Sequence, residues 1–483
     1  MAGDTARSLD AEKSDGEREI DRLFALQKQA YADSPFPSYD QRVANLDKIL
    51  RLTEAFESRF IEAISADFGN RSKYESVIAE IVVTLSGARL AKKHLRKWMQ
   101  PRGVATPLHM LPATSRIERQ PLGVVGIISP WNYPVFLALS PAIAALAAGC
   151  RVMVKPSELT PRTSDVLREA IRSEFDEAEV AVVTGGVETG QAFAETPFDH
   201  LLFTGSTAIG MRVAQSAAKN LTPVTLELGG KSPAIIDKSA DIGKAAASIA
   251  YGKMLNAGQT CVAPDYVLAP ADMIEAVTEN IAGAARSMFP EIDTTADYTS
   301  IVSDRHFARL KGFVEEARDR GAKIVEVGSA NALHPQRKLP LTLVVNPPRD
   351  AGLMREEIFG PILPILAANS AEAAIAEVNA GERPLALYWY GEDKDARDHV
   401  LQKTVSGGVT VNDSLWHVAQ ENLPFGGVGK SGLGAYHGQA GFETFSHMKP
   451  VFYQSRFAKG AAMLRPPYGP KTAKLLSIVR KII

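Results

Sequence analysis

From Gly123 onward, short apolar runs alternate with longer amphipathic runs, and this alternation is the feature that most restricts the fold. Short apolar runs that recur between helical patterns are typical of a parallel sheet with crossover helices. Several such units in a row predict a doubly wound domain, in which ligands bind at the carboxyl ends of the strands. The predicted strands are 123–129, 151–155, 180–183, 200–204 and 223–227, and the predicted helices are 134–148, 161–175 and 208–219.

A second α/β half follows the first. Before both halves, apolar residues at helical spacing predict helices from about residue 17 to residue 100, and the Pro-rich segment 103–121 predicts an extended arm. The second half has predicted helices at 241–255, 271–288 and 305–320, and predicted strands at 266–268, 323–327, 341–345, 362–367, 385–390 and 405–412.

Composition excludes several classes of function. The chain has 483 residues and a formal net charge of −1, which gives no general electrostatic reason to expect nucleic acid as a partner. Its two cysteines and nine scattered histidines show no zinc-ligand spacing, so no metal site is predicted. So few cysteines favour a reducing compartment. The N-terminus lacks the apolar core of a signal peptide, and no run is long enough to span a bilayer, which predicts a cytoplasmic protein.

Cys261 lies in a short polar loop, N-A-G-Q-T-C-V-A-P, from Asn256 to Pro264. A thiol that follows a flexible Gly258 can attack an electrophilic carbon when its surroundings favour the thiolate. Taken alone, a cysteine in a chain of this size is more often a small buried hydrophobe. The interpretation of Cys261 as a nucleophile therefore depends on its neighbours in the fold.

Glu227 ends an otherwise apolar run, and Gly229 and Gly230 follow it closely. An acid at the end of a strand can act as a general base, and burial would raise its pKa toward neutrality. The simpler alternative is a salt bridge at the strand end. Glu227 and Cys261 bracket the junction of the two α/β halves, and a cleft between domains is a common place for chemistry.

Polar residues also follow strands of the first half. In P-W-N-Y-P, the flanking prolines suit an Asn132 amide that donates to an oxyanion, although an Asx turn would use the same residue. In K-P-S-E, Lys155 and Glu158 can hold ribose hydroxyls or form only a local ion pair. In F-T-G-S-T-A-I-G, amides at Gly205 and Ser206 can meet a phosphate at a helix start, although a tight turn there needs glycine anyway.

Two later segments are less specific. In R-E-E-I-F-G-P, the spacing predicts Glu357 and Phe359 on one face of a strand, where the acid can hold a ribose and the ring can pack on nicotinamide. The segment G-G-V-G-K-S-G-L-G near Gly427 is glycine-rich, but Pro424 stands where a phosphate-binding loop needs glycine. We interpret that segment as a turn-rich loop at the active site or at an interface.

In this order, the motifs closely resemble those of the aldehyde dehydrogenase superfamily, from about residue 20 to residue 455. The phrases L-E-L-G-G-K-S-P, G-Q-T-C-V-A-P-D-Y and L-P-F-G-G-V-G-K-S-G carry the resemblance. The phrase Y-H-G-Q-A-G-F-E-T-F-S-H is similar to the class 3 branch, which includes bacterial coniferyl aldehyde dehydrogenases. The resemblance implies an α/β fold with a Rossmann-type cofactor domain, an α/β catalytic domain and a small β bridging arm.

The resemblance also implies a role for each motif residue. The implied catalytic residues are Cys261 as nucleophile, Glu227 as general base and Asn132 as oxyanion donor. The implied cofactor contacts are Lys155, Glu158, Gly205, Ser206, Trp131, Glu357 and Phe359. The implied substrate contacts are Tyr133 and Phe425. The implied domains are a leader (1–16), a cofactor domain (17–102 and 122–228), a catalytic domain (229–435), a bridging arm (103–121 and 436–456) and a tail (457–483).

The implied reaction is NAD(P)-dependent oxidation of a hydrophobic or aromatic aldehyde to a carboxylic acid, through a cysteine thiohemiacetal and a thioester, in a homodimer. Coniferyl aldehyde is the substrate the resemblance favours. Fatty aldehydes remain an alternative, as do a thiol esterase or acyl transferase without the redox step and a non-catalytic nucleotide-binding protein. Glu158 favours NAD because it should repel a 2′-phosphate, whereas Lys155 keeps NADP open.

The tail has an amphipathic pattern. Leu475, Ile478, Val479 and Ile482 share one helical face, with basic residues opposite. This pattern favours packing against the same subunit or a partner over a weak contact with a membrane surface.

Overall fold

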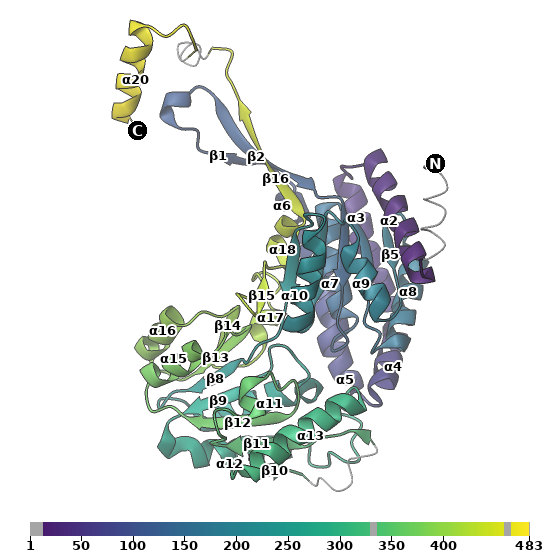
Figure 1. Ribbon diagram of the computed structural model, residues 1–483, viewed down its shortest axis with the longest axis vertical. Coiled ribbons are helices and arrows are strands. Elements are labelled where there is room, and N and C mark those ends of the chain that lie inside the picture. The colour runs from purple at the N-terminus through teal and green to yellow at the C-terminus, as the bar shows by residue number, and fades with distance from the viewer. Residues whose placement is uncertain (1–12, 329–335, 458–464, 483) are drawn as a thin grey trace.

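The computed structural model describes residues 13–328, 336–457 and 465–482. Two α/β parts, each built on a largely parallel sheet, form the body, and a slender arm projects from it (Figure 1). The predicted α/β class with a smaller antiparallel sheet is therefore confirmed. The predicted leader falls mostly on residues 1–12, which lie outside the described residues.

The first sheet has the strand order β15-β7-β6-β3-β4-β5. All neighbours are parallel except β15, which runs antiparallel to β7. The inner strands are buried on both faces, which explains why they read as continuous apolar runs. The strands are β3 (Val124–Ile128), β4 (Arg151–Lys155), β5 (Val180–Val182), β6 (His200–Thr204), β7 (Val224–Glu227) and β15 (Gly432–Leu433).

Helices cover both faces of this sheet, and the N-terminal helices pack beside them (Figure 1). Every residue of α7 is buried, since α3 and α6 cover it. The crossover helices are α7 (Phe136–Ala148), α8 (Pro161–Glu174), α9 (Val187–Glu195) and α10 (Thr207–Ala218). The N-terminal elements are α2 (Asp15–Asp33), α3 (Tyr39–Ala55), α4 (Glu57–Phe68), α5 (Lys73–Ser76), the π-helix η1 (Val77–Val82) and α6 (Val83–Trp98).

The second sheet has the order β10-β11-β12-β9-β8-β13-β14, with only β10 antiparallel to its neighbour. Its strands are β8 (Pro233–Ile236), β9 (Tyr266–Ala269), β10 (Lys323–Val327), β11 (Leu341–Val345), β12 (Ile362–Ala367), β13 (Ala386–Tyr390) and β14 (Gly408–Val411). Its helices are α11 (Ile242–Met254), η3 (Leu255–Gly258), η4 (Ala271–Met273), α12 (Ile274–Met288), α13 (Asp304–Asp319), α14 (Gly352–Arg355), α15 (Ala371–Ala380), α16 (Lys394–Lys403) and α17 (Trp416–Ala419).

The arm is a three-stranded antiparallel sheet in the order β1-β2-β16. Its long pairing runs from Ser446 opposite Pro121 to Tyr453 opposite Thr114. Helix α20 (Pro470–Ile482) lies near the tip, against η2 (Figure 1). The side chain of Ile482, predicted on its apolar face, lies outside the described ones. The arm elements are β1 (Arg102–Val104), η2 (Leu108–Met110), β2 (Thr114–Pro121), α18 (Gly438–Thr444) and β16 (Ser446–Tyr453).

Several boundaries differ from the sequence prediction. The first helix begins at Asp15, because Ser14 and Glu17 form a capping box. The sequence prediction ended a strand at Glu227 and missed β8, which is only four residues long and begins with a proline. Helices α9, α15 and α16 were also missed. Among the helices that the structure describes, none combines the length and apolar character needed to cross a membrane.

Candidate active site

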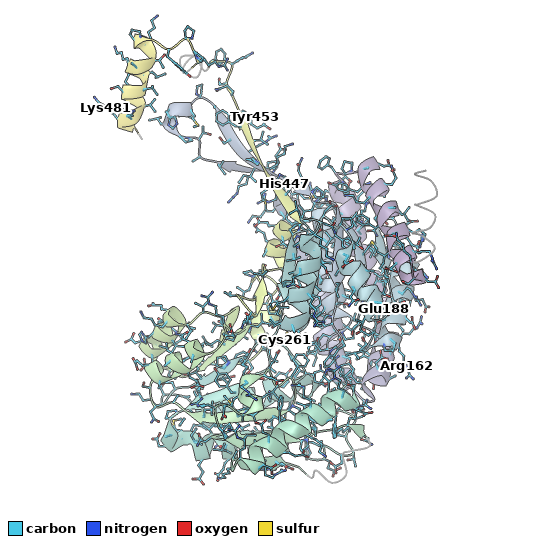
Figure 2. The ribbon with its side chains drawn as sticks, in the orientation of Figure 1. Arg162, Glu188, Cys261, His447, Tyr453 and Lys481 are labelled. Carbon is cyan, nitrogen blue, oxygen red and sulfur yellow. The ribbon has the colours of Figure 1, made fainter. Side chains whose placement is uncertain are left out.

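The loop that carries Cys261 begins with an unusual backbone. After α11, Asn256, Ala257 and Gly258 all have positive φ, at 53°, 50° and 73°. A Cβ on Gly258 would lie 2.4 Å from the carbonyl oxygen of Gly360, so only glycine fits there without a shift of backbone. These turns bring Cys261, which is half-buried, to the junction of the two α/β parts (Figure 2).

Buried side chains hold this left-handed backbone in place. The Asn256 amide donates to the carbonyl oxygens of Asn132 and Gln259, both at 3.1 Å. The Gln259 amide donates to the carbonyl oxygens of Asn256 (3.0 Å) and Ser300 (3.1 Å), and its oxygen accepts from the Val302 N–H at 2.9 Å. Because buried polar groups are costly to leave unpaired, this network fixes the residues just before the thiol.

The segment after β3 contacts the two residues that precede Cys261. The Asn132 side-chain amide donates to the Gln259 carbonyl at 3.2 Å, and the Tyr133 hydroxyl bonds to Thr260 Oγ1 at 2.6 Å. This bond of Asn132 runs across the domain junction rather than into an Asx turn. An amide nitrogen carries two N–H donors, so this bond uses one of the two that Asn132 has.

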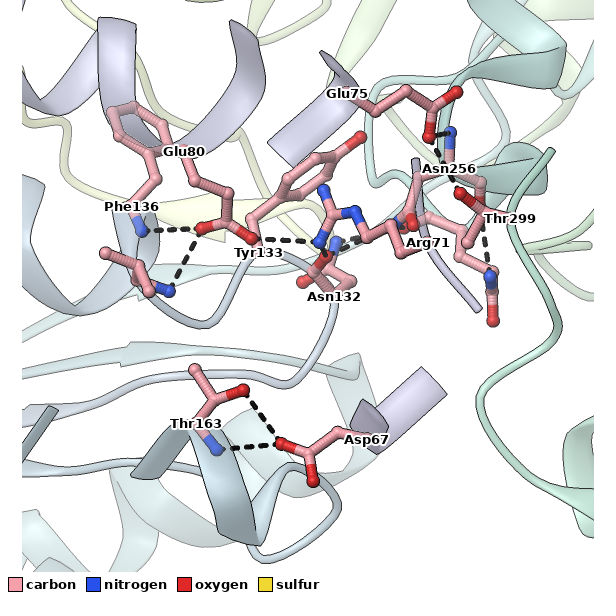
Figure 3. Close-up of polar contacts among 12 residues, drawn as sticks. Asp67, Arg71, Glu75, Glu80, Asn132, Tyr133, Phe136, Thr163, Asn256 and Thr299 are labelled. Atoms are coloured by element: carbon pink, nitrogen blue, oxygen red, sulfur yellow. Dashed lines mark hydrogen bonds and ion pairs between the residues drawn. The ribbon is translucent and has the colours of Figure 1, made fainter. Parts of the chain in front are cut away.

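A buried ion pair holds the backbone carbonyl of Asn132 (Figure 3). Arg71 Nη1 donates to Glu80 Oε1 at 2.9 Å and to the Asn132 carbonyl at 3.0 Å, and both charged side chains are fully buried. Glu80 Oε2 accepts from the N–H groups of Val135 and Phe136 at 3.0 and 2.8 Å. The pair therefore joins the π-helix η1, the backbone at Asn132 and the start of α7.

Glu75 supports the thiol loop from the same helical region (Figure 3). Its Oε2 accepts from the Asn256 N–H at 3.1 Å and from Thr299 Oγ1 at 2.8 Å. Burial is the main cause that raises the Glu75 pKa to about 7. Sequence reasoning missed Arg71, Glu75 and Glu80. The available signal was that these charges interrupt a segment that is otherwise predicted to be a core helix.

Glu227 is buried at the carboxyl end of β7. Its side chain is 2% exposed, and neither carboxylate oxygen has a hydrogen-bond partner among the described residues. The predicted alternative of a strand-end salt bridge is therefore wrong within the part of the chain that the structure describes. Burial raises the Glu227 pKa well above the ordinary glutamate value, so the carboxyl retains its proton to a higher pH.

The thiol and the carboxyls lie close enough to affect one another. Burial raises the Cys261 pKa to about 12, and the charges of Glu357 and Glu227 add to this shift. The thiol is therefore neutral at rest. A nearby positive charge would favour the thiolate, whereas loss of water from the site would favour the neutral thiol.

Glu357 and Phe359 do not share a strand face, which corrects the sequence prediction. They lie in the loop between α14 and β12, and Phe359 has a φ of 50°. Side chains bind this backbone in place of a neighbouring strand: Asp265 accepts from the Ile358 N–H at 3.0 Å, and Arg309 donates to the carbonyl of Ile358 at 2.6 Å. The loop directs the Glu357 carboxylate against Gly229.

The contact between Glu357 and Gly229 is very close. A Cβ on Gly229 would lie 1.8 Å from Glu357 Oε2, so glycine leaves the space that this carboxylate occupies. Burial, followed by the charge of Asp265, raises the Glu357 pKa to about 8. The ring of Phe359 lies edge-on to Trp131 at 5.4 Å. The Glu357 loop therefore meets both the Glu227 segment and the residue before Asn132.

The other predicted cofactor residues meet at one edge of the first sheet. Strands β7, β6, β3 and β4 are parallel neighbours, so Glu227, Gly205, Trp131 and Lys155 follow the same edge. Lys155 is 3% exposed, and its Nζ lies 3.1 Å from the Glu158 carboxylate, so the predicted local ion pair is present.

The start of α10 lies at the same edge. Ser206 is exposed, and its side chain makes no hydrogen bond to the helix start. A buried cation, free helix amides and the Glu357–Gly229 cradle fit the ribose and phosphate groups of a dinucleotide.

Aromatic residues flank the thiol on its other side. Tyr133 packs with Phe136 and Leu137, and Phe425 exchanges two backbone hydrogen bonds of 2.8 Å with Tyr436. Burial, followed by the charges of Glu227 and Cys261, raises the Tyr436 pKa. Sequence reasoning missed Tyr436, although it lies in the Y-H-G phrase.

The second cysteine and the acidic groups elsewhere do not form a comparable site. Cys150 is buried, its Sγ donates to the Phe445 carbonyl at 3.3 Å, and burial raises its pKa to about 11. Within residues 13–328, 336–457 and 465–482, no group of three or more His, Cys, Asp or Glu side chains is arranged to hold a metal ion. The arrangement around Cys261 can instead perform thiol addition and base-assisted hydrolysis.

Comparisons with known proteins agree with this chemistry. Residues 8–451 match the sequence model of the aldehyde dehydrogenase family. A coniferyl aldehyde dehydrogenase of Pseudomonas sp. (strain HR199) is 43% identical, over 96% of this chain and 97% of the relative. The substrate-bound structure of Staphylococcus aureus AldH is 38% identical, with a TM-score of 0.90 over 95% of this chain and 99% of the other. A Mycobacterium tuberculosis aldehyde dehydrogenase in complex with NAD+ is 27% identical, with a TM-score of 0.82 over 92% and 91%.

The buried Arg71–Glu80 ion pair should contribute to the stability of the fold. Arg71→Met should lower the free energy of unfolding by about 3–5 kcal/mol, because it leaves the Glu80 carboxylate buried without its cation. Urea denaturation measures this change. Arg59→Met is the matched control, since the Arg59–Glu169 pair is exposed and should contribute little. Equal stability of the two variants would contradict the role given to Arg71.

Proposed function

This chain belongs to the aldehyde dehydrogenase family, and on that premise we propose that Cys261 and Glu227 oxidise an aldehyde to a carboxylic acid with NAD(P). One observation carries the assignment of residues. The buried carboxyl of Glu227, which has no hydrogen-bond partner among the described residues, raises the pKa of the Cys261 thiol, and the Asn132 amide donates to the Gln259 carbonyl two residues before that thiol. Each of them supplies a different part of the reaction.

The residues of this chain account for the covalent steps. The Cys261 thiolate adds to the aldehyde carbon, and the oxyanion accepts hydrogen bonds from the Asn132 amide and the Cys261 N–H. Such a donor typically stabilises the transition state by about 3–4 kcal/mol. When bound, NAD(P)+ supplies a positive charge and the acceptor for the hydride. Glu227 then takes a proton from water, which attacks the thioester on Cys261 and releases the acid.

The substrate that we propose is a hydrophobic, aromatic aldehyde, with coniferyl aldehyde as the first choice. Its support is the 43% identical coniferyl aldehyde dehydrogenase and the ring of Tyr133, whose hydroxyl bonds to Thr260 beside the thiol and which packs with Phe136. Fatty aldehydes are the alternative that the same apolar surroundings allow. A thiol esterase without a redox step would have no use for the residues at the edge of the first sheet.

We propose NAD as the preferred cofactor, with NADP also accepted. Lys155 and Glu158 would hold the adenosine ribose, Gly205 and Ser206 the pyrophosphate, and Glu357 the nicotinamide ribose, with Phe359 and Trp131 nearby. Glu158 is exposed, and its negative charge would oppose a 2′-phosphate. The cofactor domain would comprise 17–102 and 122–228, and the catalytic domain 229–435.

We propose a cytoplasmic location, because Cys150 and Cys261 are both unpaired thiols. Cell fractionation followed by immunoblotting tests this location, and recovery in an oxidising compartment would contradict it.

Cys261→Ser should abolish NADH formation with every aldehyde tested while the variant still binds NAD. The hydroxyl of serine is a much weaker nucleophile than a thiolate at neutral pH. Absorbance of NADH with a panel of aromatic and aliphatic aldehydes measures turnover, and calorimetry measures NAD binding. Cys150→Ser is the control and should retain turnover, because serine can also donate to the Phe445 carbonyl. Undiminished turnover by Cys261→Ser would remove the mechanism.

Glu227→Gln should release one burst of NADH per active site and then turn over about 10²-fold more slowly, because the thioester lacks its base. Rapid-mixing absorbance measures the burst. In the parent enzyme, acid release should increase as pH rises through the elevated Glu227 pKa. Folding stability should decrease as pH rises from the ordinary glutamate pKa toward this elevated value, since the folded state holds this proton more tightly than the unfolded state. Glu227→Gln should lose the pH dependence of acid release and show a smaller decrease in stability than the parent, because Glu75 and Glu357 also have raised pKa values. Steady turnover at the parental rate would identify another base.

We propose that two copies associate through the arm. Leu108 on η2 and Phe452 on β16 are 66% and 49% exposed, and burial of these large apolar side chains against a second copy would be favourable. Leu108→Glu combined with Phe452→Glu should shift the sedimenting species from two copies toward one. Leu221→Glu, at a side chain that is 90% exposed on the body, is the matched control. A parent protein that sediments as a single copy would exclude the dimer.

A further inference from the structure

The loop that carries Glu357 depends on side chains of other segments for its conformation. Lys231, two residues before β8, donates through Nζ to the carbonyl oxygens of Leu353 (2.8 Å) and Glu356 (3.0 Å). The same Nζ forms an ion pair with the carboxylate of Asp265. The backbone just before Glu357 is therefore tied through one ammonium group to the start of the second sheet.

Asp265 holds the residue that follows Glu357. Its Oδ1 accepts from the Ile358 N–H at 3.0 Å, and its side chain is 4% exposed. Its own N–H donates to the Ser232 carbonyl at 2.7 Å. One oxygen of this buried carboxylate thus contacts the loop directly, and the other contacts it through Lys231. The loop is held on both sides of Glu357 by a single acid.

A second buried cation faces this acid. Lys253 is fully buried, its Nζ lies 4.0 Å from Asp265 Oδ1, and it has no hydrogen-bond partner among the described residues. Burial lowers the Lys253 pKa to about 8, and the charge of Asp265 opposes that shift. Asp265 is therefore paired with two cations, and loss of its charge would leave both without this partner.

The charges allow a change in position to be distinguished from a change in protonation. Burial, followed by the charge of Asp265, raises the Glu357 pKa to about 8, whereas Lys231 and Lys253 lower it. A neutral residue at position 265 should therefore favour the Glu357 carboxylate. An ionised acceptor forms stronger hydrogen bonds with hydroxyls than a neutral one does. A loss of ribose binding in such a variant would thus result from displacement of the loop.

We propose that Asp265 is a positioning residue, which holds the Glu357 carboxylate where it can accept hydrogen bonds from the nicotinamide ribose. The inference rests on the proposed role of Glu357 in binding NAD and deepens it by naming the group that orients this carboxylate. Asp265 acts through the backbone of the loop, while Glu357 contacts the ribose.

Binding of ADP and ADP-ribose, measured by titration calorimetry, tests the inference without turnover. Only ADP-ribose carries the ribose that Glu357 would hold, so the ratio of the two affinities measures this contact. Asp265→Asn should reduce the ratio by about 10-fold, the typical effect of losing a hydrogen bond to a charged group. Affinity for ADP should not change, because ADP would contact only residues at the edge of the first sheet.

Two further variants separate positioning from general damage to the fold. Glu357→Gln should lower the ratio directly, and Asp265→Asn should add little to it in the double variant, because both changes remove one contact. Lys231→Met, at a partly exposed side chain, should lower the ratio as well, and it provides the test if Asp265→Asn does not fold. Asp237→Asn is the matched control, since this acid bonds to Ser239 at the opposite end of β8.

The outcomes distinguish this inference from the proposed function. A parental ratio in Asp265→Asn and Lys231→Met, or additive effects of Asp265→Asn and Glu357→Gln, would overturn the inference while aldehyde oxidation stands. A parental ratio in Glu357→Gln would remove the role of Glu357 and the inference together. A parent protein that binds neither NAD nor ADP-ribose would contradict the proposed function, and the inference would fail with it.

Discussion

The buried Arg71–Glu80 ion pair is the interaction on which the site depends. Glu80 accepts hydrogen bonds from the first N–H groups at α7 and Arg71 donates to the Asn132 carbonyl, so one pair fixes both the start of a helix and the backbone that precedes it. Removing charges from water is unfavourable, and the additional hydrogen bonds of this pair offset that cost. The π-helix η1, which carries Glu80, is an irregular turn of the kind that recurs at functional sites.

Burial is the common cause of the unusual acid–base properties near the thiol. It raises the pKa of Glu227, Glu357 and Cys261 together, and the two carboxyls also oppose ionisation of the thiol. The resting site is therefore nearly uncharged, which lets it exist away from water. Ionisation of any of these groups therefore requires a bound molecule of opposite charge or a group that accepts the proton. The chemistry accordingly depends on which molecules are bound.

The sequence predicted the fold best where a strand is followed directly by a motif. Alternation predicted both sheets, and the motif order indicated the family before any contact was known. It could not show that Asn132 and Tyr133 touch the residues before Cys261, because those contacts join segments 127 residues apart. The Glu357 loop was predicted as a strand, but its backbone groups bond to the side chains of Asp265 and Arg309 instead of to a neighbouring strand. The roles of the individual site residues remain predictions.

The pairing of β15 with β7 has a consequence for the nascent chain. Gly432 lies opposite Glu227, so the two-residue strand β15 forms the edge of the sheet beside β7, which carries Glu227. The arm likewise needs β16 to cover β2. Synthesis runs from the N-terminus, so Cys261 is made before the residues of β15 and β16. Both sheets can therefore be completed only after residues 432–433 and 446–453 have followed Cys261 out of the ribosome.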